Sequence, residues 1–288
     1  MCVAQEYPSQ PVRIIVPYQP GGSDVLIRAI GVELSKKWKQ PVVVENRPGA
    51  DSIIGAEYVA RSAPDGYTLL ATVDSTTVVN RFLYKKLPYD PDKSFAPISL
   101  LAETEFMIFA NPKVPASDLK ELIALAKSKP GTISFGSYSK GSQADIMFNS
   151  FNKREGVDLL LVPYKGVAAT LSAAVSGEIS VSVGGYNVAG QLVKGGRLKP
   201  LAAAGPSRNP LYPEVKSAAE RGFPYVKAGL WYGVFAPAGT PEQIVKRLTS
   251  DFVSIIKDKD FAEKICFRSA LRRWAARQTS SNSVSPQT

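Results

Sequence analysis

Apolar and polar positions along this chain follow two alternating periods. Short β-branched runs, such as Val12–Val16, precede stretches with apolar residues three or four apart, such as 25–38. This alternation predicts strands at 12–16, 41–45, 67–73, 97–102, 106–110, 132–136, 158–162, 179–183, 199–204 and 229–236. It predicts helices at 25–38, 52–62, 76–83, 117–128, 142–154, 167–176, 186–194 and 241–258. The fold class is therefore α/β, with parallel sheets covered by helices and enough units for two α/β domains.

Capping residues mark where several of these helices should begin. Ser23 or Asp24 is the expected N-cap of helix 25–38, and Ser117 that of helix 117–128. Thr240 is expected to cap the last helix, with Pro241 at its first position.

The junction between the first strand and the first helix is the strongest local signal of binding. Residues 17–24 read P-Y-Q-P-G-G-S-D. A tight glycine turn into a helix N-terminus presents unpaired N–H groups that can bind an anion without a charged side chain. The candidates are Pro20, Gly21, Gly22 and Ser23. The alternative is an ordinary turn whose glycines only allow its backbone geometry.

Composition narrows the remaining function classes. The chain has 288 residues, 44% hydrophobic, no histidine and two cysteines, with a net charge of +10. Without histidine there is no Ser–His–Asp triad, no Cys–His dyad and none of the common zinc sites, so we expect no metal and no cofactor. There is also no phosphate-binding GxxxxGK[ST] loop and no dinucleotide-binding GxGxxG motif. The basic residues are scattered, so we expect no nucleic-acid surface.

Five phrases, taken in order, resemble one protein family. They are YPSQPVRIIVPYQPGGSDVLIRAIGVEL (7–34), QPVVVENRPGADSIIGAEYVARSAPDGYTLL (40–70), VPYKGVAATLSAAVSGEIS (162–180), GGRLKPLAAAGPSRNPLYPEV (195–215) and GLWYGVFAPAGTPEQIVKRL (229–248). Together they resemble the Bug-type (TctC-like) extracytoplasmic solute receptors of tripartite tricarboxylate transport systems, over about residues 7–265.

The resemblance implies a type II periplasmic-binding-protein fold, with two α/β lobes, a two-strand hinge and a ligand cleft between the lobes. Lobe one would be 7–100 plus 229–265, and lobe two 101–228. The implied ligand is a small carboxylate, such as a dicarboxylate or tricarboxylate. The implied partners are the membrane subunits of the transporter, for a monomeric receptor in the periplasm whose signal peptide is absent from this chain.

The other candidate site residues lie at further strand–helix junctions. Asp74 to Thr77 follow strand 67–73, where Ser75 and Thr76 either line the cleft or only cap a helix. By resemblance, the loop at 137–142 is a second carboxylate loop, in which Lys140 faces either solvent or the ligand. The turn at 164–166 matches the family's P-Y-K-G turn. The site residues carried over to lobe two are Ser137, Gly141, Ser142, Tyr164, Gly166 and Gly185.

Two further positions bear on the ligand and on the walls of the cleft. Many relatives have an aspartate near Gly184, and its absence here favours a plain carboxylate over an amino acid as ligand. The alternative is that Gly184 and Gly185 only relieve crowding. The aromatic residues Trp231 and Tyr232 on the returning hinge strand either wall the cleft or fill the core.

We therefore expect a solute-binding receptor and not an enzyme. The alternatives are an enzyme acting on a small phosphorylated or carboxylated substrate, and a non-transport sensor of the same fold. Residues 266–288 hold four arginines and no acid, and they do not fit the helix that ends this family. We read this tail as a possible frameshift near Cys266, which the coding DNA would decide.

Overall fold

The chain divides into two compact units. The computed structural model describes residues 7–20, 22–139 and 141–261. Unit 1 contains the residues up to Glu103 and from Trp231 onward, and unit 2 is Thr104–Leu230. The chain passes between the units twice, along β4 (Phe95–Ala110) and β9 (Gly229–Pro237).

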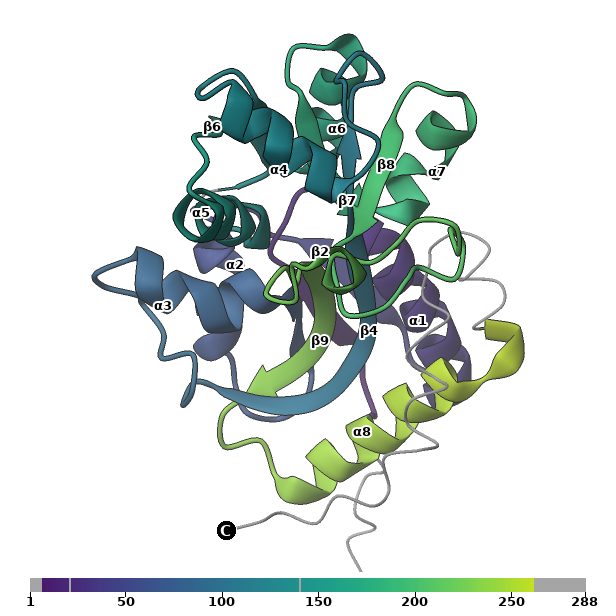
Figure 1. Ribbon diagram of the computed structural model, residues 1–288. Helices are drawn as coiled ribbons and strands as arrows, with labels where there is room; N and C mark the ends of the chain where they lie inside the picture. Colours follow the sequence, from purple (N-terminus) through teal and green to yellow (C-terminus); the bar gives the residue numbers. More distant parts are fainter. Residues whose placement is uncertain (1–6, 21, 140, 262–288) are drawn as a thin grey trace, which may run out of the picture. The chain divides into compact units, whose positions relative to one another are not determined.

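Unit 1 is built on the strands β1 (Val12–Val16), β2 (Val42–Asn46) and β3 (Thr68–Val73). The strand order is β2-β1-β3-β9-β4, in which β1 runs parallel to β2 and β3 while β9 is antiparallel to β3. The helices of this unit are α1 (Gly22–Trp38), α2 (Ile53–Ala60), α3 (Asn80–Leu83) and α8 (Glu242–Lys257), with a π-helical turn η1 (Ser75–Val79) before α3 (Figure 1).

Two hydrophobic clusters hold the helices of unit 1 on its sheet. Val12, Ile14 and Val16 pack with α1 and α8, whereas Ile15 packs with Ala56 and Val59 of α2. Alternate β1 side chains thus reach opposite faces, as a strand covered on both sides requires.

A buried carboxylate also links α8 to α1. Asp251, only 3% exposed, accepts hydrogen bonds from Trp38 Nε1 at 2.7 Å and Arg247 Nε at 2.8 Å. Lys37 Nζ lies 2.8 Å from its other oxygen. Burial acts to raise the pKa of Asp251, but the bonds from Lys37, Trp38 and Arg247 outweigh it and hold this pKa below its ordinary value.

Unit 2 repeats the α/β arrangement around β5 (Ser134–Ser137), β6 (Leu160–Pro163), β7 (Val181–Gly185) and β8 (Lys199–Ala203). Strand β5 is parallel to β6 and β7, whereas β4 is antiparallel to β7 and β8. Its helices are α4 (Leu119–Ser128), α5 (Gln143–Glu155), α6 (Val167–Ser176) and α7 (Tyr186–Lys194), with a short 3-10 helix η2 (Ala219–Arg221).

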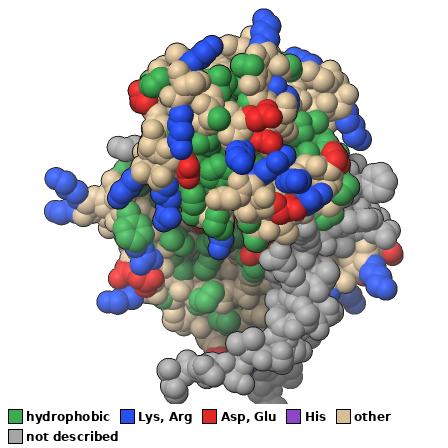
Figure 2. Space-filling view, viewed as in Figure 1, with side chains coloured by type: hydrophobic (Ala, Val, Ile, Leu, Met, Phe, Trp, Pro, Cys, Tyr) green, Lys and Arg blue, Asp and Glu red, His purple; other side chains and the backbone are tan. Residues whose placement is uncertain are grey.

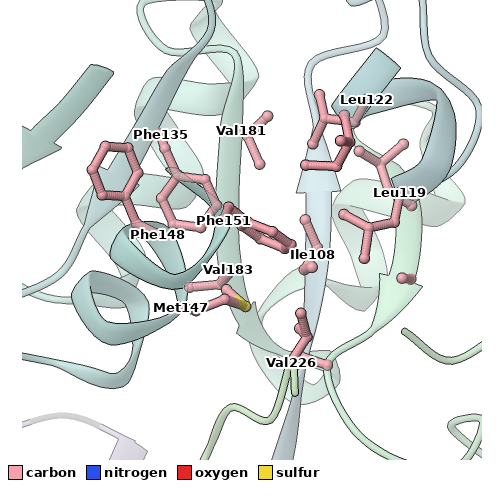
Figure 3. Close-up of a cluster of buried hydrophobic side chains, with 14 of the residues drawn as sticks. Ile108, Leu119, Leu122, Phe135, Met147, Phe148, Phe151, Val181, Val183 and Val226 are labelled. Atoms are coloured by element: carbon pink, nitrogen blue, oxygen red, sulfur yellow. The ribbon is translucent and has the colours of Figure 1, made fainter. Parts of the chain in front are cut away.

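The core of unit 2 is aromatic on its α5 side. Phe135 of β5 faces Phe148 of α5, with ring centroids 5.8 Å apart, and Phe151 is fully buried beside them (Figure 3). Leu119 and Leu122 of α4 close the other side of the same cluster. This packing fixes the start of α5 beside the end of β5.

The expected elements are present, with differences in the sheets and strands. The sheets are mixed and not purely parallel, because β4 and β9 pair antiparallel with their neighbours. The strands predicted at 97–102 and 106–110 form one strand, β4, so the polar residues Glu103 to Glu105 do not interrupt it. At this point the strand leaves unit 1 for unit 2.

Three predicted helix starts are wrong, by three residues for α1, two for α4 and one for α8. Helix α1 begins at Gly22, so Ser23 and Asp24 lie in its first turn and are not its cap. Asp118, not Ser117, caps α4 by accepting from the Glu121 N–H at 2.9 Å. The residue before α8 is Pro241, while the Thr240 hydroxyl donates to the Pro237 carbonyl instead of capping the helix.

Candidate functional site

The junction between β1 and α1 contains a turn with Pro20 and a tyrosine, Tyr18, that the sequence did not mark as a site residue. Pro20 is exposed, Gly21 lies outside the described residues, and Gly22 starts α1. The side chain of Ser23 is likewise not described. Tyr18, two residues before Pro20, extends its hydroxyl toward the end of β3, where it meets three other hydroxyls.

These groups form a hydroxyl cluster, which we define as Tyr18, Ser52, Thr72, Ser75 and Thr76. The Tyr18 oxygen lies 3.0 Å from Thr72 Oγ1, 2.9 Å from Ser75 Oγ and 2.7 Å from Thr76 Oγ1. Thr76 donates in turn to Ser52 Oγ at 2.8 Å. The cluster therefore connects three segments of unit 1 that are distant in sequence, around residues 18, 52 and 72–76.

Ser75 and Thr76 take different places in this cluster. Thr76 is fully buried, and within the described part of the chain its hydroxyl is hydrogen-bonded to other members of the cluster. Ser75 is partly exposed, and its N–H donates to Asp74 Oδ1 at 3.0 Å. Ser75 can thus reach a solute in front of the strand end, whereas Thr76 lies behind it and supports Tyr18.

Asp24 and Arg28 of α1 are bound to their own scaffold. Asp24 is buried and accepts from Asn46 Nδ2 at 2.9 Å, and the same amide donates to the Tyr18 carbonyl at 3.0 Å. Arg28 donates to Asn46 Oδ1 at 2.8 Å and lies 3.9 Å from Asp24. Asn46 therefore holds the turn that follows β1, and Arg28 is held by Asn46 and Asp24 in a structural role.

The returning strand β9 adds Tyr232 beside this junction. Tyr232 pairs with Val73 in the β3–β9 register. Burial, with further contributions from Tyr18 and Asp74, raises the pKa of Tyr232 to about 12. Tyr232 also packs on the α1–α8 core, and Trp231 packs on Phe235 at 6.3 Å, so both aromatic residues have partners within unit 1.

In unit 2, three strand–helix junctions lie at one edge of the sheet. Strands β6, β5 and β7 are parallel neighbours, and each leads directly into a helix, namely α6, α5 and α7. The carboxyl ends of such strands meet at the same edge, which is where α/β folds commonly bind ligands. This arrangement brings together Ser137, Gly141, Ser142, Tyr164, Gly166 and Gly185.

Several polar groups of the junction before α5 are bound by residues of the junction itself. Ser142 caps α5, Ser137 Oγ donates to the Ser139 carbonyl at 2.9 Å, and both side chains are buried. The Gly141 N–H donates to Asp145 Oδ2 at 2.7 Å. The Gly141 amide, expected to bind a carboxylate of the ligand, thus binds a carboxylate of the protein. Lys140 lies outside the described residues.

The junctions before α6 and α7 are more open. Gly166 precedes α6 at φ +98° and Gly185 precedes α7, and neither helix start has a side-chain cap. The Gly166 N–H is used, since it donates to the Tyr138 carbonyl at 2.8 Å. The N–H groups of the next residues begin the helices and have no intrahelical acceptor, so they can bind an anion.

Other residues of these junctions have structural partners. The Tyr164 hydroxyl donates to Glu178 at 2.7 Å, and burial together with Glu178 raises the pKa of Tyr164 to about 12. Lys165 is exposed. A Cβ on Gly184 would lie 2.9 Å from a Val167 methyl group, so glycine at this position relieves crowding against α6.

The remaining chemistry of the described residues is limited. Within them, no group of three or more His, Cys, Asp or Glu could hold a metal ion. In the same part of the chain, no helix has the length and apolar character of a membrane span. On the face shown in Figure 2, Lys and Arg are interspersed with acidic and apolar side chains.

Comparison with known proteins gives one family. The family model described as "Tripartite tricarboxylate transporter family receptor" matches residues 26–279. This match extends beyond Ile265, where we expected the resemblance to end. The tail itself lies outside the described residues.

Individual relatives agree with the family match. The chain is 33% identical to Protein BugT of Bordetella pertussis, over 93% of this chain and 82% of the relative. Among solved structures, MatC of Rhodopseudomonas palustris with bound malate is 32% identical, with a TM-score of 0.78, covering 91% of this chain and 89% of that chain. An R. palustris protein with adipate is 29% identical, with a TM-score of 0.83, covering 92% and 89%. The fold is that of these periplasmic binding proteins.

Proposed function

We propose, since this chain belongs to the tripartite tricarboxylate transporter receptor family, that it captures a small carboxylate for a transporter of that class. Members of this family are solute receptors and not enzymes, which favours a binding role over turnover. Malate and adipate in the two related structures suggest a dicarboxylate. We further propose the periplasm as its location and membrane transporter subunits as its partners.

The proposed site uses main-chain donors and hydroxyls from both units. Unit 1 would contribute residues 20–23 and Ser75. Unit 2 would contribute the junctions at 137–142, 164–166 and 185. In the proposed mechanism, exclusion of water around the bound ligand strengthens each amide–carboxylate bond.

One observation supports this proposal most directly. In unit 2, the junctions that start α6 and α7, which follow the strands on either side of β5, have glycine caps without a side-chain cap. Helix N-termini left open in this way favour an anionic group. The chain thus offers anion-binding groups while lacking the histidine chemistry of common hydrolases.

Calorimetry tests the proposal. The ligands are malate, adipate, succinate, citrate, benzoate and glutamate, and we expect at least one to bind and raise the melting temperature. A ligand at about 100 times its Kd stabilises the folded state by about 2.7 kcal/mol. If no carboxylate binds, the receptor proposal fails. If a bound acid is converted to product, the enzyme alternative replaces it. Lost uptake of that acid after gene deletion would favour transport over sensing.

The substitution Gly166→Ala tests whether the junction before α6 contacts the ligand. A Cβ on Gly166 meets no atom within 4 Å, so it would project into the space where the ligand is proposed to bind. If the added methyl group costs the ligand one charge-assisted hydrogen bond to an N–H group at the start of α6, the affinity for the ligand should fall by about ten- to a hundred-fold. Gly222→Ala is the control, because Gly222 has a similar φ of +93° and equally open surroundings. Equal affinities of the two variants would remove the α6 junction from the site.

A further inference from the structure

The helical segment formed by η1 and α3 has its polar side inward and its apolar side outward (Figure 1). Its buried side chains are polar, namely Thr76, Thr77 and Asn80. Its exposed apolar side chains are Val78, at 46% exposure, and Phe82, at 79%. A surface helix of a globular protein normally has the opposite arrangement, with the apolar side on the core.

Hydrogen bonds from the polar side hold this segment in its orientation. Asn80 Nδ2 donates to the Asp51 carbonyl at 2.9 Å. The buried hydroxyl of Tyr89 donates to the Thr76 carbonyl at 2.8 Å. Because these bonds fix the inner side of the segment, they also fix Phe82 on the outer side.

The outer side carries a group of four apolar residues, which we call the outer face of α3 and define as Val78, Val79, Phe82 and Leu83. Among the described residues, none of the four belongs to the hydrophobic clusters that hold unit 1 together. Phe82 has the highest exposure of the large apolar side chains in the described part of the chain. A contiguous exposed apolar patch of this kind marks an interaction surface.

Two lysines extend the outer face of α3. Lys85 and Lys86 follow the helix, both are exposed, and neither forms an ion pair within the described part of the chain. The other charges of residues 81–93 form two ion pairs, Arg81–Asp92 and Lys93–Asp90. The one further carboxylate bonded to this segment is that of Asp51, which accepts from the Tyr84 hydroxyl. Two lysines against one exposed carboxylate leave this surface positive.

This combination of groups suits an anionic phospholipid bilayer. A bilayer interface takes up exposed apolar side chains such as that of Phe82, and its anionic headgroups attract nearby lysines without requiring a fixed geometry. Interfaces between proteins, in contrast, are depleted in Lys and enriched in Arg. Here the arginine of the segment, Arg81, is already bound to both oxygens of Asp92, at 2.6 and 2.9 Å.

We propose that the outer face of α3, together with Lys85 and Lys86, rests on the surface of an anionic phospholipid bilayer. This contact brings the receptor to the membrane that holds its proposed transporter subunits, and in this respect alone the idea rests on the proposed function. It does not depend on which solute is bound.

The test uses the full chain and lipid vesicles, with co-sedimentation as the readout. Vesicles of phosphatidylcholine and phosphatidylglycerol in equal amounts should bind the protein more tightly than phosphatidylcholine vesicles, and salt should weaken this binding. Phe82→Ser should weaken binding to the mixed vesicles by about ten-fold, because an apolar side chain no longer enters the interface. Ile146→Ser is the matched control, since Ile146 is a helical residue of unit 2 with 56% exposure. It should change binding by less than about two-fold.

A second pair of variants tests the charges. Lys85→Glu combined with Lys86→Glu should weaken binding to the mixed vesicles by at least about ten-fold, because two attractions become repulsions. Lys113→Glu combined with Lys120→Glu is the control, since both lysines are exposed on unit 2 and the net charge is the same. It should change binding by less than about three-fold.

Each other outcome overturns the proposal. If the protein does not bind the mixed vesicles, the outer face of α3 does not meet lipid. If Phe82→Ser binds like Ile146→Ser, the apolar face is not used, and if the two lysine pairs act equally, only overall charge matters. If analytical ultracentrifugation finds a dimer that depends on Phe82 and no vesicle binding occurs, a second copy covers the face.

The receptor proposal is tested separately on the same variants. Melting temperatures verify that each variant folds, and each should bind a carboxylate ligand with the wild-type affinity. If vesicle binding fails while a carboxylate still binds, only the lipid proposal falls. If vesicles bind and no carboxylate does, only the receptor proposal falls.

Discussion

Thr76→Val tests whether the hydroxyl cluster supports the site or contacts the ligand. Valine has the same shape as threonine but replaces the hydroxyl with a methyl group. Thr76 is fully buried, and its oxygen contacts Tyr18 at 2.7 Å, Ser52 at 2.8 Å and Thr72. The substitution therefore removes three hydroxyl contacts without creating a cavity.

The expected loss in the free energy of unfolding depends on which hydroxyl partners of Thr76 keep another hydrogen bond. Tyr18 keeps Ser75 at 2.9 Å and Thr72 at 3.0 Å, whereas Ser52 loses its donor from Thr76. With a net contribution of about 0.5–1.5 kcal/mol for each hydrogen bond, partial compensation leaves a loss of about 2 kcal/mol. For a protein of this size, that corresponds to a fall in melting temperature of about 4–8 °C.

Ser75→Ala is the matched variant, because Ser75 is partly exposed and belongs to the same cluster. We expect it to weaken carboxylate binding by about ten-fold while lowering stability by less than about 1 kcal/mol. Urea unfolding and calorimetry measure the two effects separately. The reasoning is refuted if Thr76→Val unfolds like the wild type, or if it weakens ligand binding more than Ser75→Ala does.

Two further predictions concern stability. Asp251→Ala should lower the free energy of unfolding by about 2–3 kcal/mol, because Trp38 Nε1 loses its acceptor in a buried position. Urea unfolding at pH 7 measures this, and Lys246→Ala, which breaks an exposed pair on the same helix, should change stability by less than about 1 kcal/mol. Tyr232, with its pKa raised to about 12, favours the folded state below its ordinary pKa near 10, and this contribution disappears as the pH rises toward 12. Absorbance titration of tyrosinate should lose a late-ionising group in Tyr232→Phe, and an unchanged curve would contradict the assignment.

Local patterns predicted most of the elements but not every boundary between them. Alternation predicted the strands and helices of the α/β fold, apart from the continuity of β4 and the short helix η2, because burial imposes a period of two or 3.6 on the sequence. Helix starts were harder where two capable caps adjoin, as with Ser117 and Asp118. Either side chain can reach the first turn, and only the backbone path, which places Asp118 before Leu119, decides between them.

The continuous strand β4 shows a second limit of pattern reading. Glu103, Thr104 and Glu105 look like a loop between two apolar strands. In the structure they lie within β4, at the point where the chain leaves unit 1. Polar residues suit this point because a segment that joins two compact units has less apolar surface to cover than a strand inside either one.

The candidate site illustrates what sequence cannot supply. Glycine turns are visible locally, so junctions such as 164–166 were predicted, but the use of their amides depends on partners elsewhere in the fold. Gly141 was expected to donate to the ligand, yet Asp145 accepts its N–H. Tyr18 was missed because its hydroxyl partners are 54 to 58 residues away, and no local pattern marks such a contact.

These two findings change where the proposed ligand contacts should be sought. An amide that already binds a carboxylate of the protein offers little to a second one, because a negative group beside Asp145 would be repelled. The starts of α6 and α7 have no such carboxylate among their caps. In unit 1, Ser75 and Tyr18 are partly exposed, while Ser52, Thr72 and Thr76 of the same hydroxyl cluster are buried, so Ser75 can meet the ligand while the buried hydroxyls hold the cluster in place. Affinity should therefore depend more on Gly166 and Ser75 than on Gly141 and Thr76.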